Sequence, residues 1–263
     1  MVSDELWSLI EPLLPVPGPK LVEGRPRVPD RQALCGILFV LHTGIQWEYL
    51  PQELGFGSGM TCWRRLGAWN EAGVWDQLHV LLLEKLRSKD QLDWSRAVID
   101  SSHVRATRRG PKADPARSTA HRPGSKHHLI VDGQCIPLAV TLTGGNRNDV
   151  TQLLPLLDKI PAVAGLVGRP RRRPDALLAD RGYDHDKYRR LLRQRGIRPV
   201  IAKRGQPPGS GLGIFRYVVE RTIAWLHGFR RLRIRWERRD DIHESFLGLA
   251  VCLITHRHVQ RLC

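Results

Sequence analysis

Three carboxylates stand in sequence settings that suit metal-dependent chemistry. Asp100 and Asp180 each close a short apolar run that predicts a buried strand, whereas Glu220 lies in a stretch with helical spacing of apolar residues. A carboxylate at a buried position is costly unless a cation compensates its charge, and divalent metal ions are the usual compensation for clustered carboxylates. In a basic chain this arrangement points to metal-assisted chemistry on phosphodiesters.

The composition favours a polyanionic partner. The 263 residues include 42 Lys and Arg against 26 Asp and Glu, a formal charge of +16, and 41% of the residues are hydrophobic, which is ample for a packed core. No apolar run approaches the roughly 20 residues of a spanning helix, so nucleic acid is favoured over a membrane. The five cysteines contain no C-x-x-C pair, which indicates reduced thiols in the cytosol and argues against a structural zinc site.

Residues 1–91 are expected to form a helical DNA-binding region. Ser3 can cap a first helix, a second is expected from Asp30 to Gly44, and two more follow on either side of Gly73. This helix-turn-helix-like pattern suits a DNA-reading module in which Arg64 and Arg65 contact the nucleic acid. A plain helical bundle with a tryptophan-rich core is the alternative.

Residues 92–263 are expected to form the catalytic domain, of the α/β class. Three strands, a helix, a strand, a helix, a strand and final helices describe a mixed five-stranded sheet with flanking helices, in the ribonuclease-H-like order. Asp132-Gly133 predicts the turn of a hairpin between the second and third strands. The expected strands are residues 96–104, 127–131, 135–143, 176–179 and 199–202.

The sequence around the three carboxylates also resembles a known family. Residues 98–104 (VIDSSHV), 179–184 (ADRGYD) and 218–222 (VVERT, followed by Phe229-Arg230-Arg231) look like the three signature blocks of DDE transposases of the insertion sequence 5 group. Residues 43–51 (TGIQWEYLP) are similar to the segment that precedes the catalytic domain in that group. Three ordered blocks on the expected elements make the resemblance specific, and it covers nearly the whole chain.

The resemblance implies a bacterial enzyme that acts on DNA at the nucleoid, in the cytoplasm. Asp100, Asp180 and Glu220 would be the catalytic residues and would bind two Mg²⁺ ions, for which Mn²⁺ can substitute. The partners would be double-stranded DNA, both the element's terminal inverted repeats and the target, and a homodimer would form in the DNA complex. The reaction would be cleavage at the repeats followed by strand transfer.

Further basic residues are expected to contact DNA. Arg216 precedes Glu220 by one helical turn and matches the arginine of the family's signature, whereas Gly213 and His227 stand where that signature has tyrosine and lysine. An arginine-rich stretch after the same helix could track a phosphate backbone, with a solvated charged face as the alternative. The expected contacts in this half of the chain are Lys126, Arg216, Arg221, Arg230 and Arg231.

Two other activities fit the same residues. One is a metal-dependent nuclease without strand transfer, and the other is a non-catalytic DNA-binding protein derived from a transposase. Asp132 is expected to serve only its turn, and Asp149 is a candidate cap for the helix that begins near Gln152.

Overall fold

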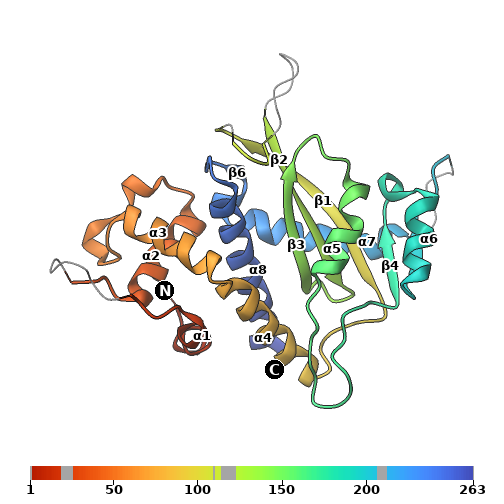
Figure 1. Ribbon diagram of the computed structural model, residues 1–263, viewed down its shortest axis with the longest axis horizontal. Coiled ribbons are helices and arrows are strands. Elements are labelled where there is room, and N and C mark those ends of the chain that lie inside the picture. Colours follow the sequence, from red (N-terminus) through yellow and green to blue (C-terminus); the bar gives the residue numbers. More distant parts are fainter. Residues whose placement is uncertain (1, 19–25, 109, 114–122, 206–211, 263) are drawn as a thin grey trace.

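A group of N-terminal helices and a mixed β-sheet lie side by side and share a long C-terminal helix (Figure 1). The computed structural model describes residues 2–18, 26–108, 110–113, 123–205 and 212–262. None of the helices in these ranges combines the length and the apolar character needed to cross a bilayer. The four cysteines within them form no disulfide.

The four predicted N-terminal helices are confirmed. The hydroxyl of Ser3 accepts a hydrogen bond from the backbone N–H of Leu6 at 3.2 Å and so caps the first helix, and Gly44 ends the second helix with a φ of 74°. Trp69 and Trp75 are buried in the core, as expected. The helices are α1 (Asp4–Ile10), α2 (Asp30–Thr43), α3 (Gly59–Glu71) and α4 (Val74–Ser88).

The sheet has the expected ribonuclease-H-like order, β3-β2-β1-β4-β5. The first three strands pair antiparallel as a meander, and β4 and β5 continue the sheet parallel to β1. A sixth strand of two residues pairs with the far end of β1; it was not predicted because two residues carry no periodic pattern. The strands are β1 (Ala97–Ala106), β2 (Gly124–Asp132), β3 (Pro137–Gly144), β4 (Ala176–Ala179), β5 (Arg198–Ile201) and β6 (Ile234–Arg235).

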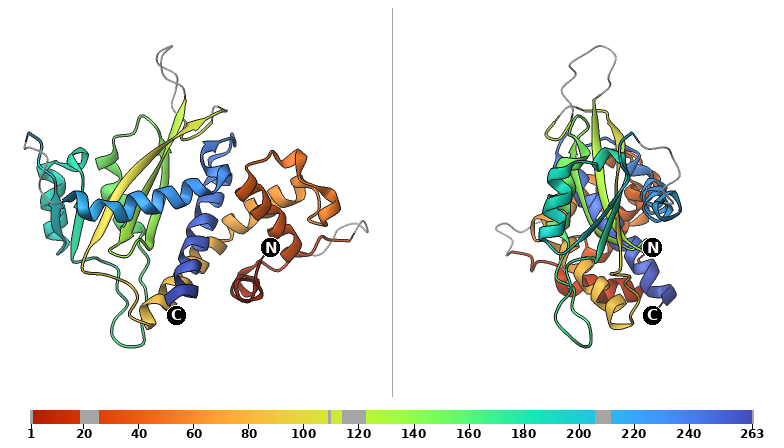
Figure 2. Two further views of the ribbon diagram at one scale, coloured as in Figure 1. Left: turned by 180° about the vertical axis from the view of Figure 1, so that it is seen from behind. Right: turned by 90° about the vertical axis from the view of Figure 1, so that its right-hand side faces the viewer.

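Helices cover both faces of the sheet, with α5 (Leu153–Lys159) and α7 (Leu212–Gly228) on opposite sides (Figures 1 and 2). The helix α6 (Asp186–Gln194) packs beside β5 at the sheet's edge. Single 3₁₀ turns complete the secondary structure: η1 (Glu11–Leu13), η2 (Trp47–Tyr49), η3 (Gln52–Leu54), η4 (Asp149–Gln152), η5 (Arg181–Tyr183) and η6 (Arg230–Leu232).

The C-terminal helix α8 (Asp240–Leu262) joins the two halves of the molecule. It packs against α3 and α4 on one side and β3 on the other. The indole N–H of Trp75 donates to the Ser245 hydroxyl at 3.0 Å, and the Cys252 thiol donates to the Trp75 carbonyl at 3.2 Å. The N-terminal helices therefore complete their core with the last helix of the chain, and a division into residues 1–91 and 92–263 stays a prediction.

Two other carboxylates, Asp132 and Asp149, already have partners within the protein. Asp132 accepts hydrogen bonds from the backbone N–H groups of Gln134 and Ile136, both at 2.8 Å, as expected of a turn residue. The expectation that Asp149 caps a helix is wrong, because α5 has no side-chain cap and the η4 turn before it is capped by Asn148, which accepts from the Val150 N–H. Asp149 forms an ion pair with Lys126 at 2.9 Å.

Candidate active site

The strand register brings Asp100 and Asp180 together. Parallel pairing joins Ala97 to Leu177 and Val98 to Leu178, so the same register carried forward places Asp180 level with Asp100. Side chains two residues apart on a strand point to the same face, so Asp100 lies on the face of Val98. Asp100 is inside β1 rather than at the end of a strand, as its apolar run suggested, because the pairing with β2 continues to Arg105.

Glu220 reaches this face of the sheet from α7, which crosses in front of β1 in the left view of Figure 2. Contact between the helix and the strand is direct, since Ser102 on β1 and His227 on α7 form a hydrogen bond of 3.0 Å. Arg216 and Glu220 are four residues apart and therefore share one side of the helix. The side chain of Glu220 is 59% exposed, whereas that of Asp100 is 17% exposed.

The guanidinium of Arg216 lies among these carboxylates. Its Nη2 atom is 3.1 Å from Asp100 Oδ2 and 3.4 Å from Glu220 Oε1. Asp180 also acts on it electrostatically, and it uses its own Oδ1 to accept from the Gly182 backbone N–H at 2.8 Å. The guanidinium of Arg216 therefore interacts with Asp100 on β1, with Asp180 after β4 and with Glu220 on α7.

Burial and the ion pair between them shift the pKa values of Asp100 and Arg216. Burial raises the pKa of Asp100, and the nearby Asp180 adds to the rise, while the Ser101 backbone N–H and Arg216 oppose it. Burial alone would lower the pKa of Arg216, but the three carboxylates outweigh burial and raise it. Arg216 therefore stays charged and opposes the rise in the pKa of Asp100.

The donor set suits a hard divalent cation. Asp100, Asp180 and Glu220 offer only oxygen atoms, which Mg²⁺ and Mn²⁺ prefer, and the place between them already holds a positive charge. Among the described residues, no three acidic, histidine or cysteine side chains converge closely enough to form a metal site as they stand. The side chain of Arg216 occupies the space between two of the three carboxylates.

Comparison with known proteins identifies the family. Residues 2–79 match a family described as "Putative transposase of IS4/5 family", and residues 94–207 and 177–256 each match a family described as "Transposase DDE domain". A Burkholderia cepacia protein named "Putative transposase for insertion sequence element IS402" is 60% identical over 151 residues, which span 57% of this chain and 72% of that one. The chain belongs to the IS4/5 family of transposases. It is a DDE transposase, as the three sequence blocks indicated.

Two further likenesses accompany this result. The "Insertion element IS402 uncharacterized 16.2 kDa protein" of Burkholderia cepacia is 54% identical over 133 residues, which span 47% of this chain and 90% of that protein. Among solved structures, the "Crystal structure of the Mos1 Strand Transfer Complex" covers 94% of this chain and 79% of its own, with a TM-score of 0.37 and 12% identity.

The basic residues expected to contact DNA differ in exposure and in the partners that they have. Arg64 on α3, Arg221 on α7 and Arg230 after α7 are exposed, and none of them forms an ion pair with an acidic side chain in the described ranges. Arg221 lies over the Trp225 ring with its guanidinium carbon 5.0 Å from the centroid. These three positions remain candidates for phosphate contact.

The other expected contacts already have partners. Arg65 pairs with Asp30 and donates to the Val28 carbonyl at 3.0 Å, so it braces α3 against the start of α2. Lys126 pairs with Asp149, as described above. A DNA contact by Arg65 or Lys126 stays a prediction. DNA would have to displace Asp30 from Arg65, or Asp149 from Lys126, to make that contact.

Arg231 departs from the expectation. Its side chain is 4% exposed, forms an ion pair with the equally buried Glu237, and donates to the Ile45 carbonyl at 2.7 Å. The structure therefore argues against a DNA contact for Arg231. Arginine-rich sequence alone could not reveal this, because the acidic partner and the carbonyl come from two different parts of the chain.

Two neighbours of the triad were not anticipated. The Tyr183 side chain is buried beside the site. Burial, followed by the charges of nearby acidic residues, Asp100 and Asp180 among them, raises the pKa of its hydroxyl, and a hydrogen bond with Ser101 opposes the rise. Ser102 binds His227, the residue at the family's lysine position. Both residues lie within the sequence blocks that carry the family resemblance, but only the fold brings their side chains to the carboxylates.

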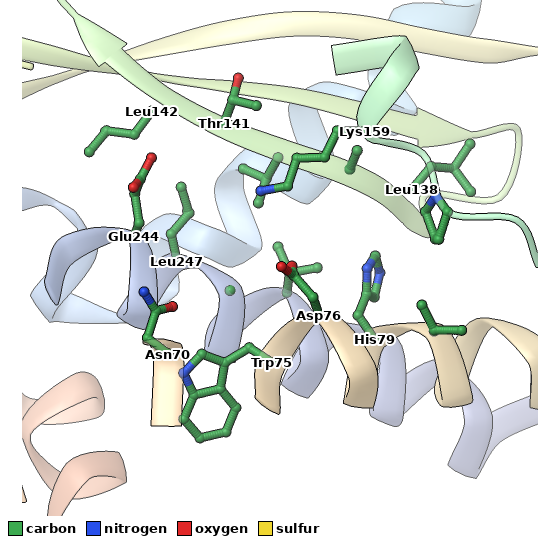
Figure 3. Close-up of a pocket in the computed structure, with 16 residues that line it drawn as sticks. Asn70, Trp75, Asp76, His79, Leu138, Thr141, Leu142, Lys159, Glu244 and Leu247 are labelled. Atoms are coloured by element: carbon green, nitrogen blue, oxygen red, sulfur yellow. The ribbon is translucent and has the colours of Figure 1, made fainter. Parts of the chain in front are cut away.

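A separate cavity of about 390 Å³ lies between α4, α8 and β3 (Figure 3). Asp76 and His79 reach into it from α4, Lys159 from the end of α5, and Glu244 from α8. Burial lowers the pKa of His79 to about 4, so this imidazole is neutral near pH 7. None of Asp100, Asp180 and Glu220 lines this cavity.

Proposed function

We propose that this transposase cuts double-stranded DNA at the terminal inverted repeats of its own element and joins those ends to target DNA. Asp100, Asp180 and Glu220 are the proposed catalytic residues and metal ligands. The observation that carries the proposal is the Arg216 guanidinium, which lies 3.1 Å from Asp100 and 3.4 Å from Glu220 and whose pKa Asp180 helps to raise. Asp100, Asp180 and Glu220 are far apart in sequence, yet all three interact with the same guanidinium.

The chain's own residues divide the work of the reaction. Asp100 is largely buried on a central strand, which holds its carboxylate in a fixed position. Glu220 is exposed and faces the side from which a phosphodiester can approach. Arg216 is one-third exposed and can donate hydrogen bonds to a phosphate oxygen of bound DNA. Two Mg²⁺ ions, or Mn²⁺ in their place, would supply activation of the attacking hydroxyl and stabilisation of the leaving oxygen.

DNA binding and assembly complete the proposal. The formal charge of +16 and the exposed Arg64, Arg221 and Arg230 favour a long phosphate backbone as partner. A homodimer would hold two element ends in one complex, and the protein would act at the bacterial nucleoid. Arg216 adds a contact beside the scissile phosphate.

The proposal is tested with labelled duplex DNA that contains the end of the element. The purified protein is incubated with this duplex and a target plasmid, in EDTA, Mg²⁺ or Mn²⁺. We expect cleavage at the end and strand-transfer products only when a divalent ion is present. Cleavage without joined products would reduce the protein to a nuclease, and binding without metal-dependent cleavage would remove the catalytic assignment altogether.

A further inference from the structure

A second cavity, of about 770 Å³, lies where the N-terminal helices meet the far end of β1. Trp47 and Trp63 line it from the N-terminal half, and Arg108, Trp236 and Arg238 line it from the catalytic half. We call it the tryptophan cleft. Its volume is within the range of roughly 300–1,000 Å³ that is typical of pockets for small organic groups.

Trp236 is the unusual member of this set. Of the eight tryptophans, all in the described ranges, it alone is neither in the buried core nor packed against it. The other two indoles of the cleft pack against neighbouring side chains. Trp47 stacks on Phe246, with the ring centroids 5.5 Å apart. Trp63 carries the Arg239 guanidinium 5.2 Å from its ring centroid. An indole left outside the core has apolar surface available for a ligand.

The tryptophan cleft is lined by four arginines and two glutamates, of which Glu237 is paired with Arg231 and Glu48 is exposed. Arg108 and Arg238 are exposed and form no ion pair with an acidic side chain in the described ranges. Arg239 is paired with Asp241, and Arg231 with Glu237, so these two are already neutralised. Planar aromatic side chains beside two unpaired arginines are the combination that binds unstacked bases and their phosphates.

The cleft is well separated from the carboxylates. Arg108 follows the end of β1, and β6, which Trp236 follows, pairs with that same end through Arg105 and Ala106. At about 3.3 Å per strand residue, the strand end lies on the order of 20 Å from Asp100. A DNA molecule that placed its scissile phosphate at Asp100 would therefore present a different nucleotide to this cleft.

We propose that the tryptophan cleft binds an unpaired, unstacked nucleobase of DNA together with its flanking phosphates. The proposal rests on the transposase acting on DNA, and it adds a site for a locally opened strand away from the point of cleavage. Because the two halves of the chain build the cleft together, a base bound there would also fix the N-terminal helices relative to the catalytic sheet.

The test measures binding without catalysis. Anisotropy of a short fluorescein-labelled oligothymidylate is recorded in EDTA for the full chain, for Trp236→Ala and for Trp236→Phe, and is repeated with a fully paired duplex. Base–aromatic stacking predicts that Trp236→Ala binds the single strand roughly 5- to 100-fold more weakly, with duplex binding unchanged. Trp236→Phe should recover most of the affinity, because a phenyl ring still offers a face for stacking, and the unchanged duplex binding excludes misfolding as the cause.

The matched control is Tyr49→Ala, an aromatic residue that is 67% exposed and does not line the cleft. It should bind the single strand like the unmodified protein. Equal single-strand binding by Trp236→Ala and the unmodified protein would overturn the proposal, and so would an equal loss on single strand and duplex. Asp100→Asn should keep single-strand binding, so failure of the cleft and failure of the catalytic assignment give different results.

Discussion

Arg216 and Asp100 are 116 residues apart in sequence, yet the guanidinium donates to Asp100 Oδ2 at 3.1 Å. The same Nη2 atom lies 3.4 Å from Glu220 Oε1. In the absence of other cations, the positive charge of the site is therefore supplied by the chain itself. A metal ion that enters between these two carboxylates competes with Arg216 for them.

This competition predicts that Arg216→Ala binds Mn²⁺ more tightly in the absence of DNA. The side chain is one-third exposed, so the pair is screened and the gain should be modest, roughly two- to fivefold in affinity by calorimetry. Cleavage of end-containing DNA should nevertheless fall, because a phosphate donor is lost. Arg221→Ala, which removes an exposed arginine of the same helix, is the control; unchanged Mn²⁺ affinity in Arg216→Ala would contradict the competition.

Isosteric changes in the triad should separate chemistry from binding. Asp100→Asn, Asp180→Asn and Glu220→Gln remove one charge each and keep the side-chain shape, so we expect cleavage to fall more than about 100-fold while duplex DNA is still bound. Asp158→Asn, at a carboxylate that is 62% exposed on α5, should cleave normally. Activity retained by all three triad variants would show that the catalytic residues lie elsewhere.

The buried pair of Arg231 and Glu237 predicts a large effect on stability. Both side chains are 4% exposed, so Arg231→Met leaves a carboxylate without its main partner in the interior. We expect the free energy of unfolding to fall by about 3–5 kcal/mol in urea denaturation. Adding Glu237→Gln should restore part of it, because the uncompensated charge is removed; a double variant no more stable than Arg231→Met would disagree with this account.

Acid should destabilise the fold through His128. Burial lowers the pKa of this fully buried imidazole to about 4, well under its ordinary value of 6.5. Between these two values the unfolded chain binds a proton that the folded chain does not, so unfolding becomes easier as the pH falls from 6.5 towards 4. The contribution is up to about 3 kcal/mol at pH 4.

The measurement is urea denaturation across this pH window with His128→Gln as the comparison. The glutamine can still reach Thr143, whose hydroxyl lies 2.7 Å from His128 Nε2, but it does not titrate. Its free energy of unfolding should therefore depend less on pH than that of the unmodified protein. Parallel pH profiles for the two proteins would exclude His128 as a source of the acid sensitivity.

The helices, the hairpin and the positions of the charged residues can be predicted from the amino-acid sequence alone. Ser3, Gly44 and the Asp132-Gly133 turn act through contacts within a few residues, so the helices and the hairpin could be predicted from them. The apolar runs and the helical segments between them indicate the order of strands and helices along the chain, which matches the ribonuclease-H-like order. The sequence blocks around the three carboxylates indicate the family to which the chain belongs.

Which of these charged residues come into contact depends on how distant segments pack. The register between β1 and β4 sets Asp180 level with Asp100, and the crossing of α7 puts Arg216 between Asp100 and Glu220. The interior position of Arg231 and the tryptophan cleft likewise arise where distant segments pack. Strand register and helix crossing depend on the fit of whole faces rather than on local periodicity, so no short stretch of sequence records them.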